Sequence, residues 1–414
     1  MVDVQVDFLA STTWDDTMAE RMRWLREHDP VHWSEVNQLW VVSRYADVAY
    51  VSMHHKIFCS GHGVRPGNPT RIGLIDEDDP RHTQLRSLIN KGFTPRMVHK
   101  LEAPLRAIVT AAVDRVATRG RCDFVEDVAV PIPLLLIADM MGIRQEDRER
   151  FHRWSDALIA ADGNLDDPDI MGAATMAFLE YSEYLRDVIE DRRRQPRDDL
   201  VSILVAAKDA GTLADRDNAL RHRLSDEHQR LANDELVMLL VILLVAGNET
   251  TRNAISGGMQ LLMENPGERQ KLVERPDLIR SAVEEMVRLV SPVRTFGRTA
   301  TEDTELRGKT IKRAQTVLML YPSANRDAEQ FEDPDVFDVE RNPDHLGFGI
   351  GTHYCLGANL ARMEMRVTFE ELLRRLPDMQ LDGRVVLRPS ALVRSCVSMP
   401  VRFTSERGDV RGHP

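Results

Sequence analysis

The segment "FGIGTHYCLG", residues 348–357, places one cysteine among turn-prone glycines. Gly349 and Gly351 allow the backbone to turn tightly and to approach a large planar group. Cys355 comes just before "LGANLARMEMRVTFEELLRRL", which has the apolar periodicity of an amphipathic helix. Amide donors and the dipole at the start of that helix are expected to lower the pKa of the thiol. A thiolate in a loop shaped to pass a flat macrocycle is an axial haem ligand. A buried structural cysteine would explain neither the glycines nor Phe348.

The stretch "AGNETT", residues 246–251, interrupts an otherwise apolar helical segment with polar side chains. Ala246 and Thr250 are one turn apart and share a face, where the small Ala246 leaves room for a flat ligand. The Thr250 hydroxyl can bond to the carbonyl of residue 246 and open the turn. Glu249 stands beside it, so the pair has the groups needed to deliver protons into a dry pocket. A helix kink satisfied by its own side chains explains the stretch equally well.

In "VEEMVRLVSP", residues 283–292, Glu285 and Arg288 are spaced to share one helix face. Such a pair is usually a surface salt bridge that contributes little to stability. Glu284 lies four residues before Arg288, so the spacing alone leaves the partner of the arginine open.

Two other binding motifs are weaker. His55, Cys59 and His62 are metal-ligand types at short spacing, but they lack a fourth ligand nearby, so satisfied or exposed side chains are the preferred interpretation. The glycines of residues 347–351 would need another glycine at Thr352 to form a dinucleotide-binding loop, and no βαβ pattern precedes them. We set the dinucleotide interpretation aside.

The composition indicates a globular protein with a reducing, cytoplasmic setting. The chain has 414 residues, 43% of them hydrophobic, and four cysteines without close pairing. The N-terminus lacks the features of a signal peptide, and the longest apolar run, residues 236–247, is too short to span a bilayer. A net charge of −12 argues against nucleic acid as a partner. Residues 81–101 differ from this balance because they contain basic side chains and no acidic ones.

The elements expected to position these groups are mainly helices. Residues 30–45 alternate around a turn and predict a β-hairpin, whereas residues 60–80 are rich in Gly and Pro and predict a long loop. A long buried helix is predicted from an N-cap at Asn233 to Glu264. We expect one domain over 1–414, mainly α with a smaller β part, divided into β-rich stretches at about 30–60, 295–325 and 380–404 and helical stretches at about 81–290 and 355–376.

These motifs together resemble the cytochromes P450, the haem-thiolate monooxygenases. The pattern Phe348-x-x-Gly351-x-His353-x-Cys355-x-Gly357 is similar to their haem-binding loop and is highly specific. The resemblance covers nearly the whole chain in family order and implies the P450 fold, with a long central helix over a buried haem b. Stretches such as "AGNETTRNAISGGM" look like the actinobacterial enzymes that oxidise the side chain of cholesterol and related lipids. The charged connection at residues 212–233 is longer than is usual in those relatives.

The resemblance also implies roles for individual residues. Cys355 would be the iron ligand, and Thr250 and Glu249 the catalytic proton-delivery pair. The remaining haem contacts would be His82, Arg86, Ala246, Arg298, Phe348, Gly349, His353 and Gly357. A structural cluster would join Glu285, Arg288 and Arg341. Candidate substrate-pocket residues are Ile72, Leu74, Ile75, Val245, Val293, Phe296 and Val393.

The implied reaction is O₂ activation followed by hydroxylation of a C–H bond of an apolar lipid, with a steroid side chain as the first choice. Branched fatty acids and terpenoids are the alternative substrates. A peroxide-driven haem enzyme and a haem-based ligand binder or sensor are the rival classes, and the Glu249–Thr250 pair disfavours both. Electrons would come from a ferredoxin and its reductase, with docking at the basic face of Lys91, Arg96 and Lys100, and no membrane anchor is expected.

Overall fold

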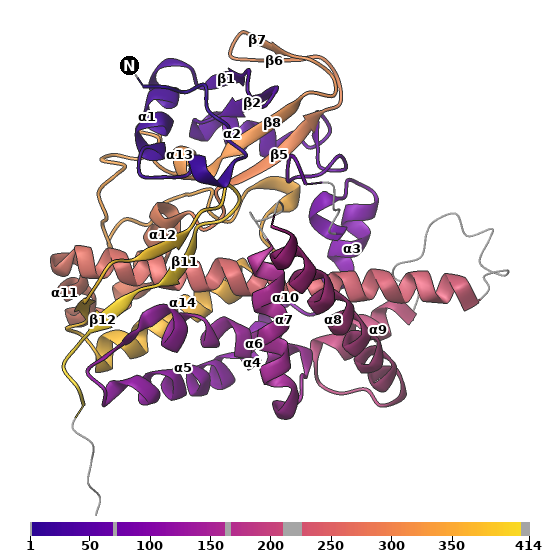
Figure 1. The fold of residues 1–414 in the computed structure, drawn as a ribbon, viewed down its shortest axis with the longest axis vertical. Coiled ribbons are helices and arrows are strands. Elements are labelled where there is room, and N and C mark those ends of the chain that lie inside the picture. Colours follow the sequence, from indigo (N-terminus) through magenta and orange to yellow (C-terminus); the bar gives the residue numbers. More distant parts are fainter. Residues whose placement is uncertain (1, 69–72, 162–166, 210–225, 407–414) are drawn as a thin grey trace, which may run out of the picture.

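The computed structural model describes residues 2–68, 73–161, 167–209 and 226–406. A five-stranded sheet and a large helical part make up most of this structure (Figure 1). The sheet has the order β1-β2-β8-β5-β3. Its strands are β1 (Val31–Ser34), β2 (Leu39–Val42), β3 (Phe58–Cys59), β5 (Thr295–Ala300) and β8 (Thr316–Leu320).

The predicted hairpin at residues 30–45 is present as β1 and β2. The two strands pair antiparallel, with Val31 opposite Val42 and Trp33 opposite Trp40. β2 then pairs parallel with β8, so the N-terminal hairpin joins a sheet whose other strands come from much later in the chain. Apolar side chains of this sheet, including Val42 and Val317, are buried in a core of their own.

Three smaller sheets are also present in the described residues. β4 (Arg121–Asp123), β12 (Pro400–Arg402) and β9 (Gln380–Leu381) form one sheet, and β10 (Val386–Arg388) pairs with β11 (Ser395–Ser398). β6 (Thr304–Leu306) and β7 (Lys309–Ile311) form a separate hairpin. β4 therefore interrupts the stretch that was expected to be helical.

The helical part is arranged around one long helix, α10 (Asp226–Glu264), which crosses the molecule in Figure 1. It contacts α6, α8, α12 and α14, and its apolar residues belong to the largest buried core. The helices are α1 (Met18–His28), α2 (Tyr45–Met53), α3 (Arg81–Asn90), α4 (Pro95–Lys100), α5 (Glu102–Ala117), α6 (Pro131–Met141), α7 (Arg148–Ala160), α8 (Pro168–Arg194), α9 (Leu200–Asp209), α11 (Pro266–Glu274), α12 (Ile279–Val290), α13 (Tyr321–Ala324) and α14 (Ala358–Arg375).

The predicted N-cap of the central helix at Asn233 is wrong, because α10 begins at Asp226. The segment before Asn233 is rich in Glu, Gln, Arg, Leu and Ala, which favour helix, so one capping residue does not stop it. Most of the charged connection at residues 212–233 lies outside the described residues.

Polar side chains fix the middle of α10 to its neighbours. The buried Asn248 amide donates to the Ser155 hydroxyl of α7 over 2.8 Å. Asn253 accepts a 2.7 Å hydrogen bond from the backbone N–H of Cys396 in β11. No helix in the described ranges is long and apolar enough to cross a membrane.

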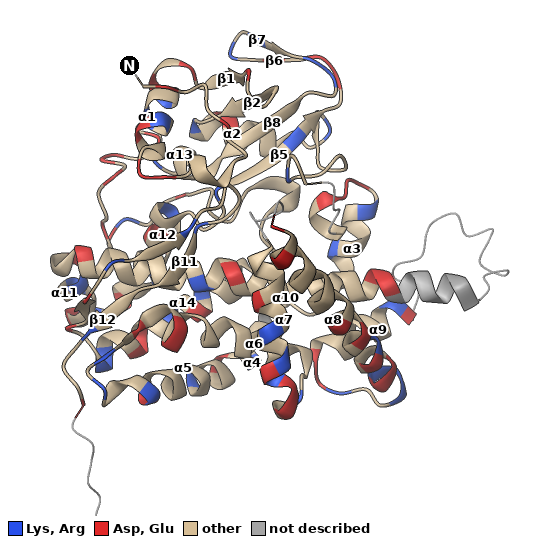
Figure 2. Cartoon of the chain, in the orientation of Figure 1, with Lys and Arg blue, Asp and Glu red and all other residues tan. Residues whose placement is uncertain are grey.

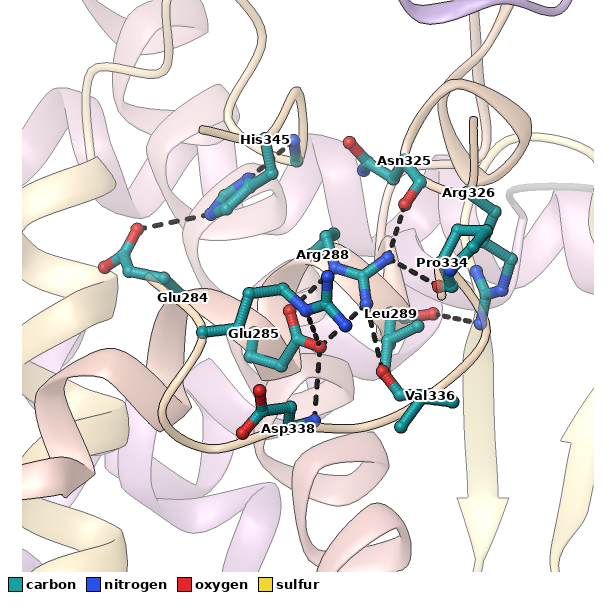
Figure 3. A network of polar contacts seen from close by, with 12 residues as sticks. Glu284, Glu285, Arg288, Leu289, Asn325, Arg326, Pro334, Val336, Asp338 and His345 are labelled. Carbon is teal, nitrogen blue, oxygen red and sulfur yellow. Dashed lines mark hydrogen bonds and ion pairs between the residues drawn. The ribbon is translucent and has the colours of Figure 1, made fainter. Parts of the chain in front are cut away.

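A buried charge network fixes α12 against the loop that follows α13 (Figure 3). Arg288 donates two 2.7 Å hydrogen bonds to Glu285, and both side chains are fully buried. Its remaining N–H groups reach the carbonyl oxygens of Asn325, Pro334 and Val336. Arg341 Nε lies 3.1 Å from the same glutamate. The arginine is thus neutralised and satisfied, which makes its burial possible.

We predict that Glu285→Ala lowers the free energy of unfolding by about 3–5 kcal/mol, because it leaves the buried Arg288 charge without its counter-ion. Denaturant unfolding of the purified protein measures this change. Glu274→Gln, at an exposed position of α11, is the control and should shift the midpoint little. Equal midpoints for the two variants would contradict the prediction.

Candidate active site

A large cavity lies beside α10 and reaches residues 348–357, which we call the Cys355 loop. The helix contributes one face to it, with side chains at intervals of three and four residues. These are Leu239, Ile242, Leu243, Ala246, Gly247, Thr250, Thr251 and Ala254. Other parts of the wall come from α3, α6, α14, β5 and the Cys355 loop, so the cavity is assembled from segments far apart in sequence.

The Cys355 loop has the tight backbone that its glycines predict. Gly349 and Gly351 have φ angles of +68° and +77°, which favour glycine. A Cβ on Gly351 would lie 2.9 Å from the carbonyl oxygen of Ser52. The backbone N–H of Cys355 donates to the carbonyl of Phe348 over 2.8 Å and closes the loop just before α14. The chain is thereby directed so that Cys355 lines the cavity.

The expected lowering of the Cys355 pKa is wrong in its net direction. Burial raises the pKa of the Cys355 thiol, and this effect exceeds the opposing contributions of the Gly357 and Ala358 amides and of Arg86 and Arg362. The amides at the start of α14 therefore favour the thiolate, but their effect is smaller than the cost of removing the charged sulfur from water. A bound cation would supply the missing stabilisation, so the donor fits an iron centre.

Basic and imidazole side chains gather at another part of the cavity wall. His82 and Arg86 come from α3, Arg298 from β5 and His353 from the Cys355 loop. The rings of His82 and His353 are 4.2 Å apart. Burial, followed by the charges of Arg298, His82 and Arg86, lowers the pKa of His353 to about 2. Burial also lowers the pKa of His82.

This cluster has hydrogen-bonding capacity that the described protein leaves unused. Neither ring nitrogen of the buried His82 makes a hydrogen bond, although Asp79 Oδ1 lies 3.9 Å from Nδ1. The buried Arg298, the half-buried Arg86 and the two neutral imidazoles are suited to bind anionic carboxylates. Together with the thiol of Cys355, which lines the same cavity, they fit a macrocycle that carries an iron and two carboxylate groups.

Thr250 and Glu249 lie on different sides of α10. The Thr250 hydroxyl lines the cavity and donates to the carbonyl of Ala246 over 2.7 Å. Glu249 is buried, is absent from the cavity wall, and forms a 2.6 Å ion pair with Arg252. It also accepts a hydrogen bond from Asn253. The alcohol therefore reaches the cavity directly, whereas the acid contacts side chains of its own helix.

The predicted apolar pocket residues divide into three groups. Leu74, Ile75, Val293 and Phe296 line the cavity. Val245 and Val393 do not, because Val245 is off the lining face of α10 and Val393 forms a β-bridge with Val293. Ile72 lies outside the described residues.

Sequence reasoning missed several lining or supporting residues. Leu360, Ala361 and Glu364 lie on the cavity face of α14, and burial raises the pKa of Glu364 to about 8. Helical spacing after Cys355 could have identified this face. The Ser60 hydroxyl lies 3.1 Å from His353 Nε2, a contact that no local pattern reveals.

The metal interpretation of His55, Cys59 and His62 gains no support. Within the described ranges, no group of three or more His, Cys, Asp or Glu side chains is placed to hold a metal ion. His55 instead bonds to the Thr352 hydroxyl at 3.0 Å.

Comparisons with known proteins agree with this geometry. A sequence model described as Cytochrome P450 matches residues 9–378. A "Steroid C26-monooxygenase" of Mycobacterium tuberculosis (strain ATCC 25618 / H37Rv) is 39% identical over 386 residues, which cover 92% of each chain. A protein of the same name from Mycolicibacterium smegmatis (strain ATCC 700084 / mc(2)155) is 37% identical over 393 residues, or 94% of each chain.

Solved structures with the same arrangement include two with bound ligands. Mycobacterium marinum cytochrome P450 CYP268A2 in complex with pseudoionone has a TM-score of 0.86 and 34% identity, and the match covers 97% of this chain and 99% of that one. CYP109E1 from Bacillus megaterium in complex with testosterone has a TM-score of 0.81 and 32% identity, with 94% and 99% covered.

We predict that Gly351→Ala destabilises the protein by about 2 kcal/mol, because it puts a side chain at positive φ and against a backbone carbonyl. Thermal and urea unfolding measure the change. Gly267→Ala is the matched control, since the space around Gly267 is open and its φ is not positive. A loss no larger than that of the control would be inconsistent with the strained loop.

Proposed function

This chain belongs to the cytochrome P450 family of haem monooxygenases, and from that premise we propose that it hydroxylates the side chain of a steroid or a similar large apolar lipid. The cofactor in this proposal is haem b. Cys355 would ligate the iron, and His82, Arg86, Arg298 and His353 would bind the haem carboxylates. Ala246, Phe348, Gly349 and Gly357 would contact the ring.

The chemistry divides between cofactor and protein. When bound, haem iron with a thiolate ligand supplies the reductive activation of O₂. Thr250 would hold a proton donor at the reacting oxygen, since its hydroxyl faces the cavity. Glu249 would supply protons when its ion pair with Arg252 separates. Neither rival class, the peroxide-driven enzyme or the sensor, requires this acid and alcohol.

The observation that carries the substrate proposal is the apolar wall of the cavity. Apart from the groups assigned to the haem and the buried Glu364, its side chains are almost all aliphatic or aromatic, including Leu74, Ile75, Val293 and Phe296. Burial of a lipid at roughly 25 cal/mol per Å² supplies affinity without specific polar contacts. The two relatives named for steroid C26-monooxygenation support a sterol side chain as the first choice.

Branched fatty acids are the second candidate, because Arg65 and Arg71 lie in the loop predicted beside the pocket. Arg65 is half-buried and has Asp76 within 3.9 Å, so an internal carboxylate already accompanies it. Arg71 lies outside the described residues. This reduces the case for a carboxylate-bearing substrate. Terpenoids are the third candidate, since a similar structure contains pseudoionone.

The electron donors in this proposal are a ferredoxin and its reductase in the cytoplasm. Lys91, Arg96 and Lys100 are exposed on and next to α3 and α4, although Lys100 also pairs with Asp198. Four free thiols are consistent with a reducing compartment. We treat residues 1–414 as one catalytic domain, because strands from distant parts of the chain share sheets, as β4 does with β12.

The substrate proposal predicts that cholest-4-en-3-one shifts the spin state of the ferric haem and is hydroxylated on its side chain. Spectral titration followed by product analysis tests this, with a methyl-branched fatty acid and pseudoionone in parallel. Tight binding and turnover of pseudoionone alone would refute the lipid assignment and leave the monooxygenase assignment intact.

For Thr250→Ala we expect unchanged haem content and substrate binding, but diversion of reducing equivalents to hydrogen peroxide. The variant lacks the hydroxyl that orders proton delivery in the cavity. The ratio of product formed to NAD(P)H consumed is the measurement. Thr310→Ala, at an exposed strand position, serves as the control. Normal coupling in Thr250→Ala would show that the threonine lacks this role.

Reversal of Lys91, Arg96 and Lys100 to Glu should slow reduction by an acidic ferredoxin and flatten the salt dependence of its rate. Stopped-flow reduction at several ionic strengths measures both effects. The control reverses three exposed basic residues of the β6–β7 region, where Figure 2 shows Lys and Arg in blue. These residues are Lys309, Lys312 and Arg313. Unchanged rates in the first variant would locate docking elsewhere.

A further inference from the structure

Glu284 and Glu285 are neighbours on α12 but reach different partners. Glu285 forms an ion pair with Arg288. The structure thus decides which of the two glutamates is the partner of the arginine, which the sequence spacing leaves open. Figure 3 shows Glu284 directed away from that network and toward His345. Glu284 also pairs with Arg362 of α14. Its two partners thus lie on opposite sides of the Cys355 loop in the sequence.

The first contact of Glu284 fixes the start of the loop. His345 Nε2 lies 3.2 Å from Glu284 Oε2. His345 Nδ1 accepts a 3.0 Å hydrogen bond from the backbone N–H of Gly347, so in the neutral ring the proton is on Nε2 and is donated to the carboxylate. The imidazole therefore connects α12 to the backbone immediately before Phe348.

The second contact fixes the end of the loop. Arg362 binds Glu284 through two N–H groups, with Nε 2.7 Å from Oε1 and Nη2 2.8 Å from Oε2. Its third nitrogen, Nη1, donates to the Tyr354 hydroxyl over 2.9 Å. Although burial raises the pKa of Glu284, hydrogen bonds from His345 and Arg362 lower it to about 2. The carboxylate is thus charged throughout the working pH range.

Both contacts converge on Phe348. The Arg362 guanidinium carbon lies 4.4 Å from the centroid of the Phe348 ring, and the His345 ring centroid is 5.6 Å from it. The carbonyl of Phe348 accepts the hydrogen bond from the Cys355 N–H. A displacement of Arg362 or His345 would therefore shift Phe348, and through its carbonyl the backbone of Cys355.

We propose that Glu284 is a positioning residue for the thiolate ligand, because it joins the two ends of the Cys355 loop and thereby fixes Phe348 and the sulfur. The inference rests on the proposed function, in which Cys355 ligates the haem iron. A simple salt bridge on the partly exposed rim of α12 would affect stability slightly and leave the loop unchanged. The two roles therefore differ in what their loss does to the loop.

The experiment compares Glu284→Gln, Glu284→Ala and Arg362→Lys in the holoenzyme. Asp277→Asn, an exposed carboxylate just before α12, is the matched control. Three readouts are needed: hydrogen exchange of residues 345–357, the rate of haem transfer to apomyoglobin, and the share of the ferrous carbon-monoxide complex with the red-shifted thiolate band.

In both Glu284 variants we expect faster exchange in the loop, about tenfold faster haem transfer and a smaller thiolate band. Arg362→Lys keeps the charge but loses the two-point contact, so it should shift the same readouts in the same direction. If Glu284→Ala does not fold, Glu284→Gln and Arg362→Lys decide the matter.

The inference would be overturned if the Glu284 variants matched Asp277→Asn in hydrogen exchange, haem transfer and spectra. A lower melting temperature alone would not support it. A wild-type protein without the thiolate band would instead refute the proposed function. The exchange measurement would still test whether Glu284 fixes the loop, so the two failures can be told apart.

Discussion

The cost of burying a thiolate is the constraint on which much of the structure depends. Burial raises the pKa of Cys355, so the ionised sulfur requires compensation from its surroundings. Part of that compensation is local, since the Gly357 and Ala358 amides face the sulfur at the start of α14. Arg86 of α3 and Arg362, one turn further along α14, also favour the charged form. The iron proposed as the partner of the sulfur would supply the remaining stabilisation of the thiolate. The loop backbone directs the amides toward the sulfur, and the two arginines add positive charge.

A second balance concerns the charges around the cavity. Burial, followed by the positive charge of nearby arginines, lowers the pKa of His82 and His353, so both imidazoles are neutral beside Arg86 and Arg298. The same groups are well suited to hold two carboxylates. The protein thus leaves binding capacity unused on this part of the wall, while the α10 face and the substrate side offer mainly apolar surface. In the proposed function, the basic part of the wall would hold the carboxylates of the cofactor, and the apolar part would contact the lipid.

Two consecutive glutamates on α12 illustrate how one helix can serve both the fold and the site. Glu285 neutralises the fully buried Arg288, and that pair fixes the loop after α13. Glu284 extends instead to His345 and Arg362, on both sides of the Cys355 loop. The helical turn directs adjacent side chains about 100° apart, so neighbours in sequence contact different parts of the protein. The Cys355 loop and the loop after α13 are therefore contacted by the same helix, but through separate ion pairs.

The sequence by itself determined the features that depend on local backbone chemistry. The glycine-flanked Cys355, the hairpin at residues 30–45 and the long apolar helix through Ala246 were all recognisable, because turn residues and apolar periodicity are local signals. Tertiary structure decided what depends on burial and on contacts between distant segments. It set the net direction of the Cys355 pKa, since desolvation exceeds the helix-start effect. It also turned Glu249 toward Arg252, removed Val245 from the cavity wall and brought Ser60 to His353. Spacing cannot predict these outcomes, because each depends on which surface the rest of the chain covers.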